Sequence, residues 1–292
     1  SAERGNGNST VSIDIDENIY GFDRTANLTV ASVDGTKILK IGVSQPCQSD
    51  ITEDHYYKLP VIFHIIYKDA SNTQQYVKEG HMATLLEKVN NLYKNCGQEL
   101  NMEFVLATHT PDGRELAEPG VDRVQWDIAK INHNAFMGYL NPDNIPARYT
   151  ALTWDPKRYI NVAIYSFAAE STSGISYLPY LVAPYSLDGL EQISEEEASQ
   201  PLNHPYCVSI NNANIYAVTD SYYEVQNIVG TIAHELGHFL GLYHTFGENA
   251  NGYTRADTDY CTDTQPYYRT TYLTKVNNLL KNKTIADLTD EE

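Results

Sequence analysis

The chain has 292 residues, which is enough for one large domain with an appended segment and for a sizeable hydrophobic core. Hydrophobic residues make up 42% and charged residues 20%, and this composition excludes collagen-like and wholly disordered chains. The 20 basic and 38 acidic residues give a formal net charge of -18, which disfavours nucleic acid and anionic membranes as partners. No apolar run reaches the length of a membrane span, so we expect no transmembrane segment.

Residues 1–50 are predicted to form a small β-rich segment that ends in a linker. Apolar and polar residues alternate near its start, and two strand-like stretches follow at 28–33 and 37–41. Asp34 and Gly35 lie between these stretches, and an Asp-Gly pair readily adopts the positive φ angles of a tight turn. We therefore predict a β-hairpin, and its role as a pro-segment or as an accessory domain stays open.

Residues 51–292 are predicted to form a second domain of the α/β (α+β) class. The continuous apolar run 59–67 predicts a buried central strand, and apolar residues recur at helical spacing over 85–93. Strand-like stretches follow at 102–106 and 159–165. The order strand, helix, strand, strand indicates an α/β fold with a mixed sheet.

Three other segments of this domain are predicted from composition. Residues from about 109 to 158 are rich in Asn, Pro and Asp, so we expect a long irregular region. The acidic run 194–197 is typical of a solvated helix start, and 273–280 fits a short amphipathic helix.

The strongest chemical signal is a group of three histidines with a glutamate. His234 and His238 are four residues apart, so on a helix they project from one face about 5 to 6 Å from each other, close enough to bind one ion. Glu235 lies beside them, in the position of a general base that hydrogen-bonds a metal-bound water. Gly241 is expected to end the helix with a left-handed turn, so that His244 can supply a third nitrogen. Three imidazoles with an open fourth position are typical of a catalytic zinc site.

Chance seldom produces this spacing in a chain with nine histidines, so we favour a metal site over histidines that merely occupy an amphipathic helix. The stretch 231–246 resembles the zinc motif of the metzincin clan of metallopeptidases, and most closely that of the pappalysin family, which includes the bacterial ulilysin type. The stretches 59–67 and 154–162 are similar to the same family. Together these similarities cover about residues 56–266.

The resemblance implies a metzincin-type zincin catalytic domain with substrate in a cleft between two subdomains. An upper subdomain at about 56–241 would hold a mixed twisted sheet and a long active-site helix, and an irregular lower subdomain would follow at 242–292. The implied function is a zinc-dependent endopeptidase that acts on protein or peptide substrates. The alternatives are a catalytically inactive metzincin-like surface protein that binds peptide or glycan, and a calcium-dependent interaction module.

By the same resemblance, His234, His238 and His244 match the zinc ligands, and Glu235 matches the general base. Zinc would polarise the scissile carbonyl, while Glu235 takes the proton of the zinc-bound water and returns it to the leaving amine. The sequence shows no heptad pattern, and we expect a monomer.

The stretch 173–179 is similar to the strand along the upper rim of the family's cleft. The resemblance implies that Gly174, Ile175, Ser176 and Tyr177 hold substrate by adding it as a further strand. The alternative is an ordinary edge strand ended by a proline.

An acidic loop after the histidines is similar to a segment that binds calcium in some members of the family. The candidate ligands are Asp257, Asp259, Asp263 and Thr264, because calcium prefers hard oxygen ligands. This chain reads Asp-Thr-Gln-Pro where the family has Asp-Thr-Pro, and the alternative is a plain acidic loop.

One feature of metzincins, a methionine-containing turn after the third histidine, has no counterpart in this sequence. The three methionines are Met82, Met102 and Met137, and all of them precede the histidines. Either the given chain lacks a stretch, or another residue takes the place of this methionine.

The four cysteines, Cys47, Cys96, Cys207 and Cys261, lie too far apart for a cysteine-based zinc site. Two disulfides would suit an extracytoplasmic enzyme, secreted or at the cell surface, with a lipid-anchored precursor as one route. Cys47 could instead act as a thiolate that blocks the zinc in a latent precursor. The first residues lack the apolar core of a signal peptide, so the chain is either cytoplasmic or already processed.

Overall fold

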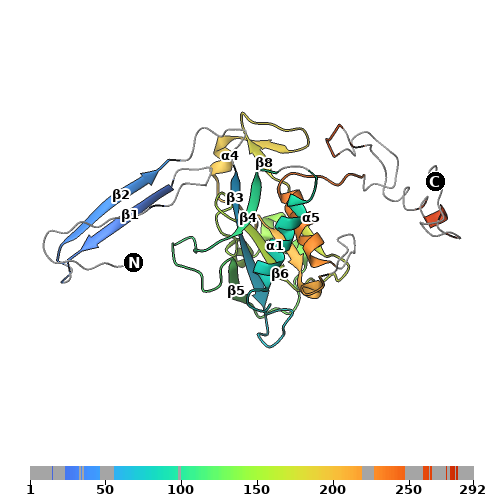
Figure 1. Cartoon of the computed structure of the whole chain (residues 1–292), viewed down its shortest axis with the longest axis horizontal. Coiled ribbons are helices and arrows are strands. Elements are labelled where there is room, and N and C mark those ends of the chain that lie inside the picture. The colour runs from blue at the N-terminus through green and yellow to red at the C-terminus, as the bar shows by residue number, and fades with distance from the viewer. Residues whose placement is uncertain are drawn as a thin grey trace. The chain divides into compact units, whose positions relative to one another are not determined.

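The computed structural model describes residues 24–32, 36–46, 56–97, 100–218 and 227–246, together with 15, 34, 259–262, 264, 274, 277–279 and 281. Two compact units are present (Figure 1): residues 1–59 with 99–105 form one, and residues 60–98 with 106–292 form the other.

The first unit contains the predicted hairpin. Strands β1 (Arg24–Ala31) and β2 (Ile38–Gln45) pair antiparallel, with Leu28 opposite Ile41. Alternation along each strand puts apolar side chains on one face, as predicted for a hairpin. The existence of a small N-terminal β segment is thereby confirmed.

The connection in this hairpin is longer than the predicted tight turn. The Ser32 N–H donates to the carbonyl of Lys37 over 2.8 Å, so residues 32–37 form the loop. The Asp34 carboxylate accepts hydrogen bonds from the Ser32 hydroxyl and from the N–H and hydroxyl of Thr36. These bonds lower the pKa of Asp34 to about 2, so Asp34 stabilises the connection as an ionised carboxylate.

A six-stranded mixed sheet forms the framework of the site. In spatial order it contains β4 (Met102–Leu106), β3 (Tyr57–Tyr67), β6 (Ile160–Tyr165), β10 (Val208–Asn211) and β7 (Gly174–Ser176), and β5 (Val121–Gln125) also pairs with β3. The pairs of β3 with β5 and β6 and of β10 with β6 are parallel, whereas β7 runs antiparallel to β10. The predicted α/β class with a mixed sheet is therefore confirmed, and β7 is the last strand of the sheet.

Two helices pack against each other beside this sheet. Helix α1 (His81–Lys94) confirms the helical spacing over 85–93, and it lies along helix α5 (Ile228–Phe239) in Figure 1. The Tyr93 hydroxyl donates to the carbonyl of Ala233 over 2.9 Å and so joins the two helices. Helix α5 also contacts β7 and β10, which places it beside the β7 end of the sheet as the described residues form it.

An apolar cluster packs around β6 and β10 and includes Phe136, Met137, Tyr165, Phe167 and Cys207. Successive residues of a strand point to opposite faces of a sheet. The Cys207 side chain is fully buried, and burial raises its pKa to about 12.

The region 109–158 is less irregular than predicted. Strand β5 lies within it, followed by the short helices α2 (His133–Phe136) and α3 (Ala147–Thr150) and by a 3-10 turn at Pro142–Asn144. The strand was missed because it is five residues long and mostly polar. Its polar side chains have partners, since the Asp122 carboxylate lies 2.9 Å from Nδ1 of the fully buried His64.

Smaller elements complete the second unit. Strands β8 (Tyr180–Val182) and β9 (Glu191–Ile193) form a parallel pair, and α4 (Glu195–Ser199) follows. The predicted acidic helix start is confirmed, because Ser194 and Glu197 form reciprocal capping bonds. The described residues of the predicted tail helix, 274 and 277–279, are helical.

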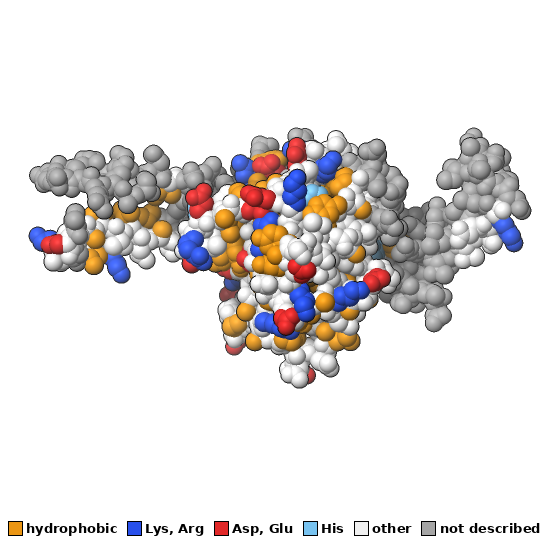
Figure 2. Space-filling model, turned by 90° about the horizontal axis from the view of Figure 1, so that it is seen from below, with side chains coloured by type: hydrophobic (Ala, Val, Ile, Leu, Met, Phe, Trp, Pro, Cys, Tyr) orange, Lys and Arg blue, Asp and Glu red, His pale blue; other side chains and the backbone are white. Residues whose placement is uncertain are grey.

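None of the helices in the described part of the chain is long and apolar enough to cross a membrane. On the face shown in Figure 2, basic and acidic side chains lie interspersed over the described residues. Cys207 and Cys261 carry free thiols, so the prediction of two disulfides, which needs all four cysteines, is wrong. Cys47 lies outside the described residues.

Candidate metal centre

Helix α5 has one face buried in the core and another face exposed. Its N-terminus is capped by Asn227, whose side-chain oxygen accepts the Val229 N–H over 3.0 Å. The apolar side chains of Ile228, Val229, Ile232, Leu236 and Phe239 are buried. The exposed side of the helix carries the two histidines of the motif.

The turn after α5 returns the chain toward the helix. The Gly241 N–H donates to the carbonyl of His238, and the Leu242 N–H donates to the carbonyl of Gly237, each over 2.9 Å. This pair of bonds is a Schellman motif, and Gly241 has the positive φ of 103° that the motif requires. The left-handed turn predicted at Gly241 is thus confirmed.

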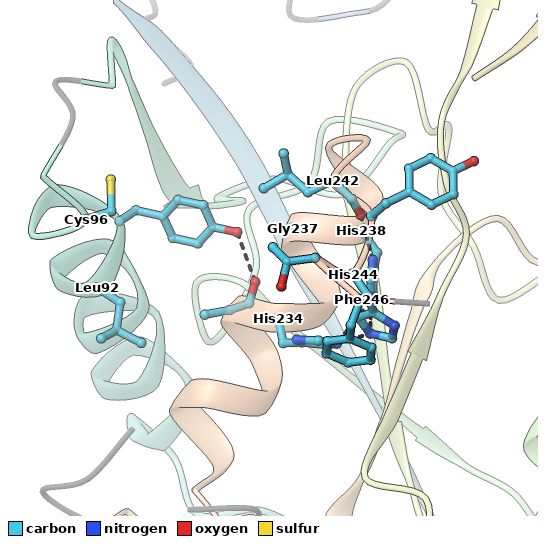
Figure 3. A pocket seen from close by; sticks show the side chains of 12 residues that line it. Leu92, Cys96, His234, Gly237, His238, Leu242, His244 and Phe246 are labelled. Carbon is cyan, nitrogen blue, oxygen red and sulfur yellow. Dashed lines mark hydrogen bonds between the residues drawn. The ribbon is translucent and has the colours of Figure 1, made fainter. Parts of the chain in front are cut away.

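The turn brings three imidazoles together (Figure 3). The Nε2 atom of His234 lies 3.0 Å from that of His238 and 3.0 Å from that of His244, and the latter two are 3.1 Å apart. In the described part of the chain, these residues are the one group of His, Cys, Asp or Glu side chains close enough to hold a metal ion.

The protonation of these rings suits metal binding. Nδ1 of His238 lies 2.7 Å from the carbonyl oxygen of Leu242, so Nδ1 carries the proton and donates it. Nε2 of the neutral ring is then left with its lone pair facing the other two histidines. Partial desolvation, and secondly the two neighbouring imidazoles, lower the pKa of His234 to about 4, so this ring is neutral near pH 7.

These donors fit zinc. Lone pairs that converge without a cation between them repel, whereas three imidazole nitrogens without a fourth protein ligand are a common donor set of catalytic zinc. The residues present are therefore compatible with the ion that the sequence resemblance implies.

Glu235 lies on the buried side of α5, between the helix and the sheet. Its side chain is 6% exposed, and burial raises the pKa of this carboxyl to about 8. A Cβ atom placed on Gly174 would lie 2.8 Å from Oε1 of Glu235, so the carboxyl is packed directly against strand β7. A base with a raised pKa holds a proton more strongly than an exposed carboxylate does.

Among the described residues, no strand pairs with the outer edge of β7, which lies beside this carboxyl. The Asn211 N–H donates to the carbonyl of Ser173, and hydrogen-bonded pairs alternate along an antiparallel ladder. Ile175 is therefore the next residue bonded to β10, while the N–H and carbonyl groups of Gly174 and Ser176 face outward. The Tyr139 hydroxyl donates to the outward carbonyl of Ser176 in a long bond of 3.4 Å.

Aromatic side chains lie around the outer edge of β7, which we call the rim. The Tyr139 ring, half exposed, lies 5.3 Å from the ring of Tyr177, which stacks on Tyr206 at 5.5 Å. The ring of Tyr206 lies 5.2 Å from that of Phe239, which belongs to α5. The residue that follows β7, Tyr177, is thus connected to helix α5 through packed rings.

A cavity of about 410 Å³ lies beside the three histidines, which form part of its lining (Figure 3). It lies between α1 and α5, and its lining is mainly apolar. Besides the three histidines, it is lined by Leu92, Tyr93, Cys96, Ala233, Gly237, Leu242, Tyr243, Thr245 and Phe246. The Phe246 ring stacks on His244 with centroids 4.8 Å apart, and no methionine is among the lining residues.

The predicted calcium site has no support in the described residues. The Asp259 carboxylate accepts the Cys261 N–H over 3.0 Å and belongs to no group of three His, Cys, Asp or Glu side chains among the described residues. Asp257 and Asp263 lie outside the described residues, as does Cys47, for which a latency role was the alternative to a disulfide. We therefore retain only the histidine group as a metal site.

Two features of the site were not predicted from sequence. Tyr139 belongs to the region expected to be irregular, and no motif marks it. Gly174 was predicted to bind substrate, but its close approach to Glu235 was not anticipated. The contact joins residues far apart in the sequence, so spacing gave no signal for it.

The comparisons with known proteins point to one family. The family model Peptidase_M43, described as "Pregnancy-associated plasma protein-A", matches residues 143–287. No curated protein sequence matches the chain.

Two solved structures from Tannerella forsythia are similar at 18% sequence identity. Mature mirolysin in complex with a cleaved peptide has a TM-score of 0.48, and the match covers 71% of this chain and 71% of mirolysin. A mutant of promirolysin has a TM-score of 0.49, with 72% of this chain and 62% of promirolysin covered.

Proposed function

We propose, from the premise that this chain belongs to the pappalysin family of metallopeptidases, that it is a zinc-dependent endopeptidase in which Glu235 carries the proton transfers. The observation that carries the proposal is the convergence of three imidazole nitrogens within 3.1 Å of one another, on the helix that also holds a buried carboxyl. Its substrates would be proteins or peptides.

The histidines His234, His238 and His244 would hold the ion through their Nε2 atoms. Zinc bound there would supply Lewis acidity, which polarises a carbonyl group and makes water more acidic. The Leu242 carbonyl keeps the proton of His238 on Nδ1, so this ring is fixed in the tautomer that can coordinate. The protein's part is therefore to present three neutral rings in one fixed arrangement.

Glu235 would move the protons of the hydrolysis. A carboxylate oxygen of Glu235 takes a proton from the attacking water, and the resulting acid gives a proton to the nitrogen of the leaving amine. Burial of a carboxyl costs free energy, and general-base catalysis gives a chemical reason to retain it here. A buried carboxyl in this position therefore favours an enzyme over a surface protein that only binds peptide or glycan.

Substrate would bind along the outer edge of β7. An extended peptide that pairs with the outward N–H and carbonyl groups of Gly174 would lie next to the Glu235 carboxyl, since this carboxyl packs against the same glycine. Tyr139 occupies the outward carbonyl of Ser176, so the peptide must displace its hydroxyl or leave the edge at that point.

The test is cleavage of a diverse peptide library by the purified, zinc-loaded protein, with zinc content measured in parallel. We expect one equivalent of zinc and cleavage that Glu235→Gln abolishes while the zinc is retained. Glu196→Gln is the matched control, because it makes the same change at an exposed position of α4. Zinc binding without any cleavage, or cleavage unaffected by Glu235→Gln, would contradict the proposal.

Two further points belong to the same proposal. We propose an extracytoplasmic location, either secreted or at the cell surface, which fractionation of the source cells would test. We also propose a monomer, and light scattering of the purified protein would show a mass near 32.8 kDa.

A further inference from the structure

The contact between Gly174 and Glu235 leaves no room for a side chain on the glycine. A Cβ atom at position 174 would lie 2.6 Å from Cγ, 2.8 Å from Oε1 and 2.9 Å from Cδ of Glu235. All three distances are shorter than any normal contact between non-bonded atoms. The glycine has no positive φ angle, so backbone conformation does not explain its presence.

The two partners differ in how easily they can move. Strand β7 is fixed to β10, because the Asn211 N–H donates to the carbonyl of Ser173 and the Asn211 side-chain amide donates to the carbonyl of Thr172. Glu235 belongs to a helix whose apolar face is buried, but its carboxyl is separated from that backbone by rotatable bonds. A side chain at position 174 would therefore displace the carboxyl and leave the strand in place.

We propose that Gly174 is a positioning residue for Glu235: its lack of a side chain lets the carboxyl lie against the rim strand, beside the main-chain groups that would bind substrate. The outward N–H and carbonyl groups of Gly174 and the carboxyl of Glu235 then belong to one surface. Substrate paired with Gly174 is thereby placed within reach of the base. The inference rests on the proposed function and adds the residue that sets the position of its base.

The first experiment is Gly174→Ala in the zinc-loaded protein, with kcat and KM for one cleavable peptide measured beside zinc content and Tm. We expect kcat to fall by about 100-fold, the effect of displacing a reacting group by about 1 Å. Zinc content and Tm should stay close to those of the wild type, because the displaced group is the mobile end of a side chain. Gly42→Ala is the matched control, since a Cβ there meets only Asn27 Oδ1 at 3.9 Å and its φ is not positive. An unchanged kcat in Gly174→Ala would overturn the proposal.

A double-mutant cycle with Glu235→Asp separates positioning from a general structural effect. Aspartate is one methylene shorter, so its carboxyl withdraws from position 174. We expect Glu235→Asp to lower kcat far less in the Gly174→Ala background than in the wild type, by a factor of about 10 or more. Independent effects that multiply would contradict a role of Gly174 in placing the carboxyl.

Crystal structures of the wild type and Gly174→Ala provide a readout that does not depend on activity. The Glu235 carboxyl should move away from β7 in the variant, while the three imidazoles keep their positions. If the wild type cleaves no peptide, the proposed function fails, and these two structures still decide the positioning role. A carboxyl that stays in place in Gly174→Ala would overturn the inference whether or not the protein is a peptidase.

Discussion

The two sides of helix α5 are organised in opposite ways. On one side, His234 is exposed and His238 and His244 are half-buried beside a cavity. On the adjacent face, about 60° around the helix from His238, Glu235 is 6% exposed and is packed against a strand of the sheet. The proposed metal-binding side thus faces solvent, whereas the proposed base is inserted into the framework of the fold.

This difference separates binding of the ion from stability of the fold. None of the three imidazoles belongs to the fully buried core, so their removal should cost the ion and leave the apolar side of α5 intact. Glu235 is packed against Gly174 of the sheet, so a small change at this contact should alter proton transfer while the metal site persists. Substitutions on the first side should therefore reduce zinc binding, and substitutions around Glu235 should reduce proton transfer.

The largest effect is expected from removing one imidazole. Loss of a residue that only supports a metal ligand weakens metal affinity by about 10- to 100-fold, and loss of a ligand should weaken it more. We therefore expect His238→Ala to weaken zinc binding by at least about 100-fold. Cleavage should fall below detection, while the Tm of the metal-free protein falls by only a few °C, the effect of losing the bond from Nδ1 to the Leu242 carbonyl. Zinc titration and thermal unfolding of the metal-free form measure both. His109→Ala is the control, because His109 is exposed and outside the histidine group. Full zinc affinity in His238→Ala would contradict the assignment of this side.

Substitution on the buried side should spare the ion. Glu235→Gln should lower kcat by roughly 10²- to 10⁴-fold, the range that positioned general bases contribute. Zinc content should be unchanged, and the Tm of the metal-free form should not fall, since the amide has the same shape and carries no charge to desolvate. Single-turnover kinetics, calorimetry and metal analysis test the three parts. A loss of zinc equal to that in His238→Ala would show that the two sides are not separate.

The sequence predicted the exposed side well because its geometry is local. His234, His238, Gly241 and His244 lie within eleven residues, and helix periodicity together with one glycine turn brings them together. The hairpin at β1 and β2 was predictable for the same reason. Its connection, between strands that end at Ala31 and begin at Ile38, is longer than a two-residue turn, and the Asp34 carboxylate bonds to Ser32 and Thr36 within it.

The buried side was harder to predict because its contacts join distant parts of the chain. Gly174 meets Glu235 only after β7 pairs with β10 and α5 packs on both strands. Tyr139 reaches Ser176 from a region that was expected to be irregular. Strand β5 was missed because its polar side chains find partners only in the folded sheet, as Asp122 does with His64. Residue types alone carry no signal for such tertiary contacts.

A smaller effect is expected at the turn that completes the exposed side. Gly241 has a φ of 103°, and Gly241→Ala places a Cβ 3.3 Å from Leu190 Cδ1, so the turn becomes strained. A left-handed conformation costs an alanine about 1–2 kcal/mol, which corresponds to a fall in Tm of about 2–8 °C. Zinc affinity should fall as well, because the same turn positions His244. Leu240→Ala is the control, since this neighbouring residue is exposed and has a right-handed conformation. An unchanged Tm with unchanged zinc affinity would show that the turn does not determine the third ligand.

The smallest effect is expected where the rim meets solvent. Tyr139→Phe removes the hydroxyl that donates to the Ser176 carbonyl over 3.4 Å, and this carbonyl becomes free for a substrate N–H. A hydrogen bond contributes about 0.5–1.5 kcal/mol, and a bond as long as this one belongs at the lower end of that range. We therefore expect a KM about 2-fold lower, with kcat unchanged. Tyr185→Phe is the matched control, because the Tyr185 side chain is 73% exposed. A KM that rises in Tyr139→Phe would mean that the hydroxyl itself binds substrate. Because the change alters neither zinc content nor Glu235, a shift confined to KM would place the peptide on the β7 edge, between the exposed and buried sides of the site.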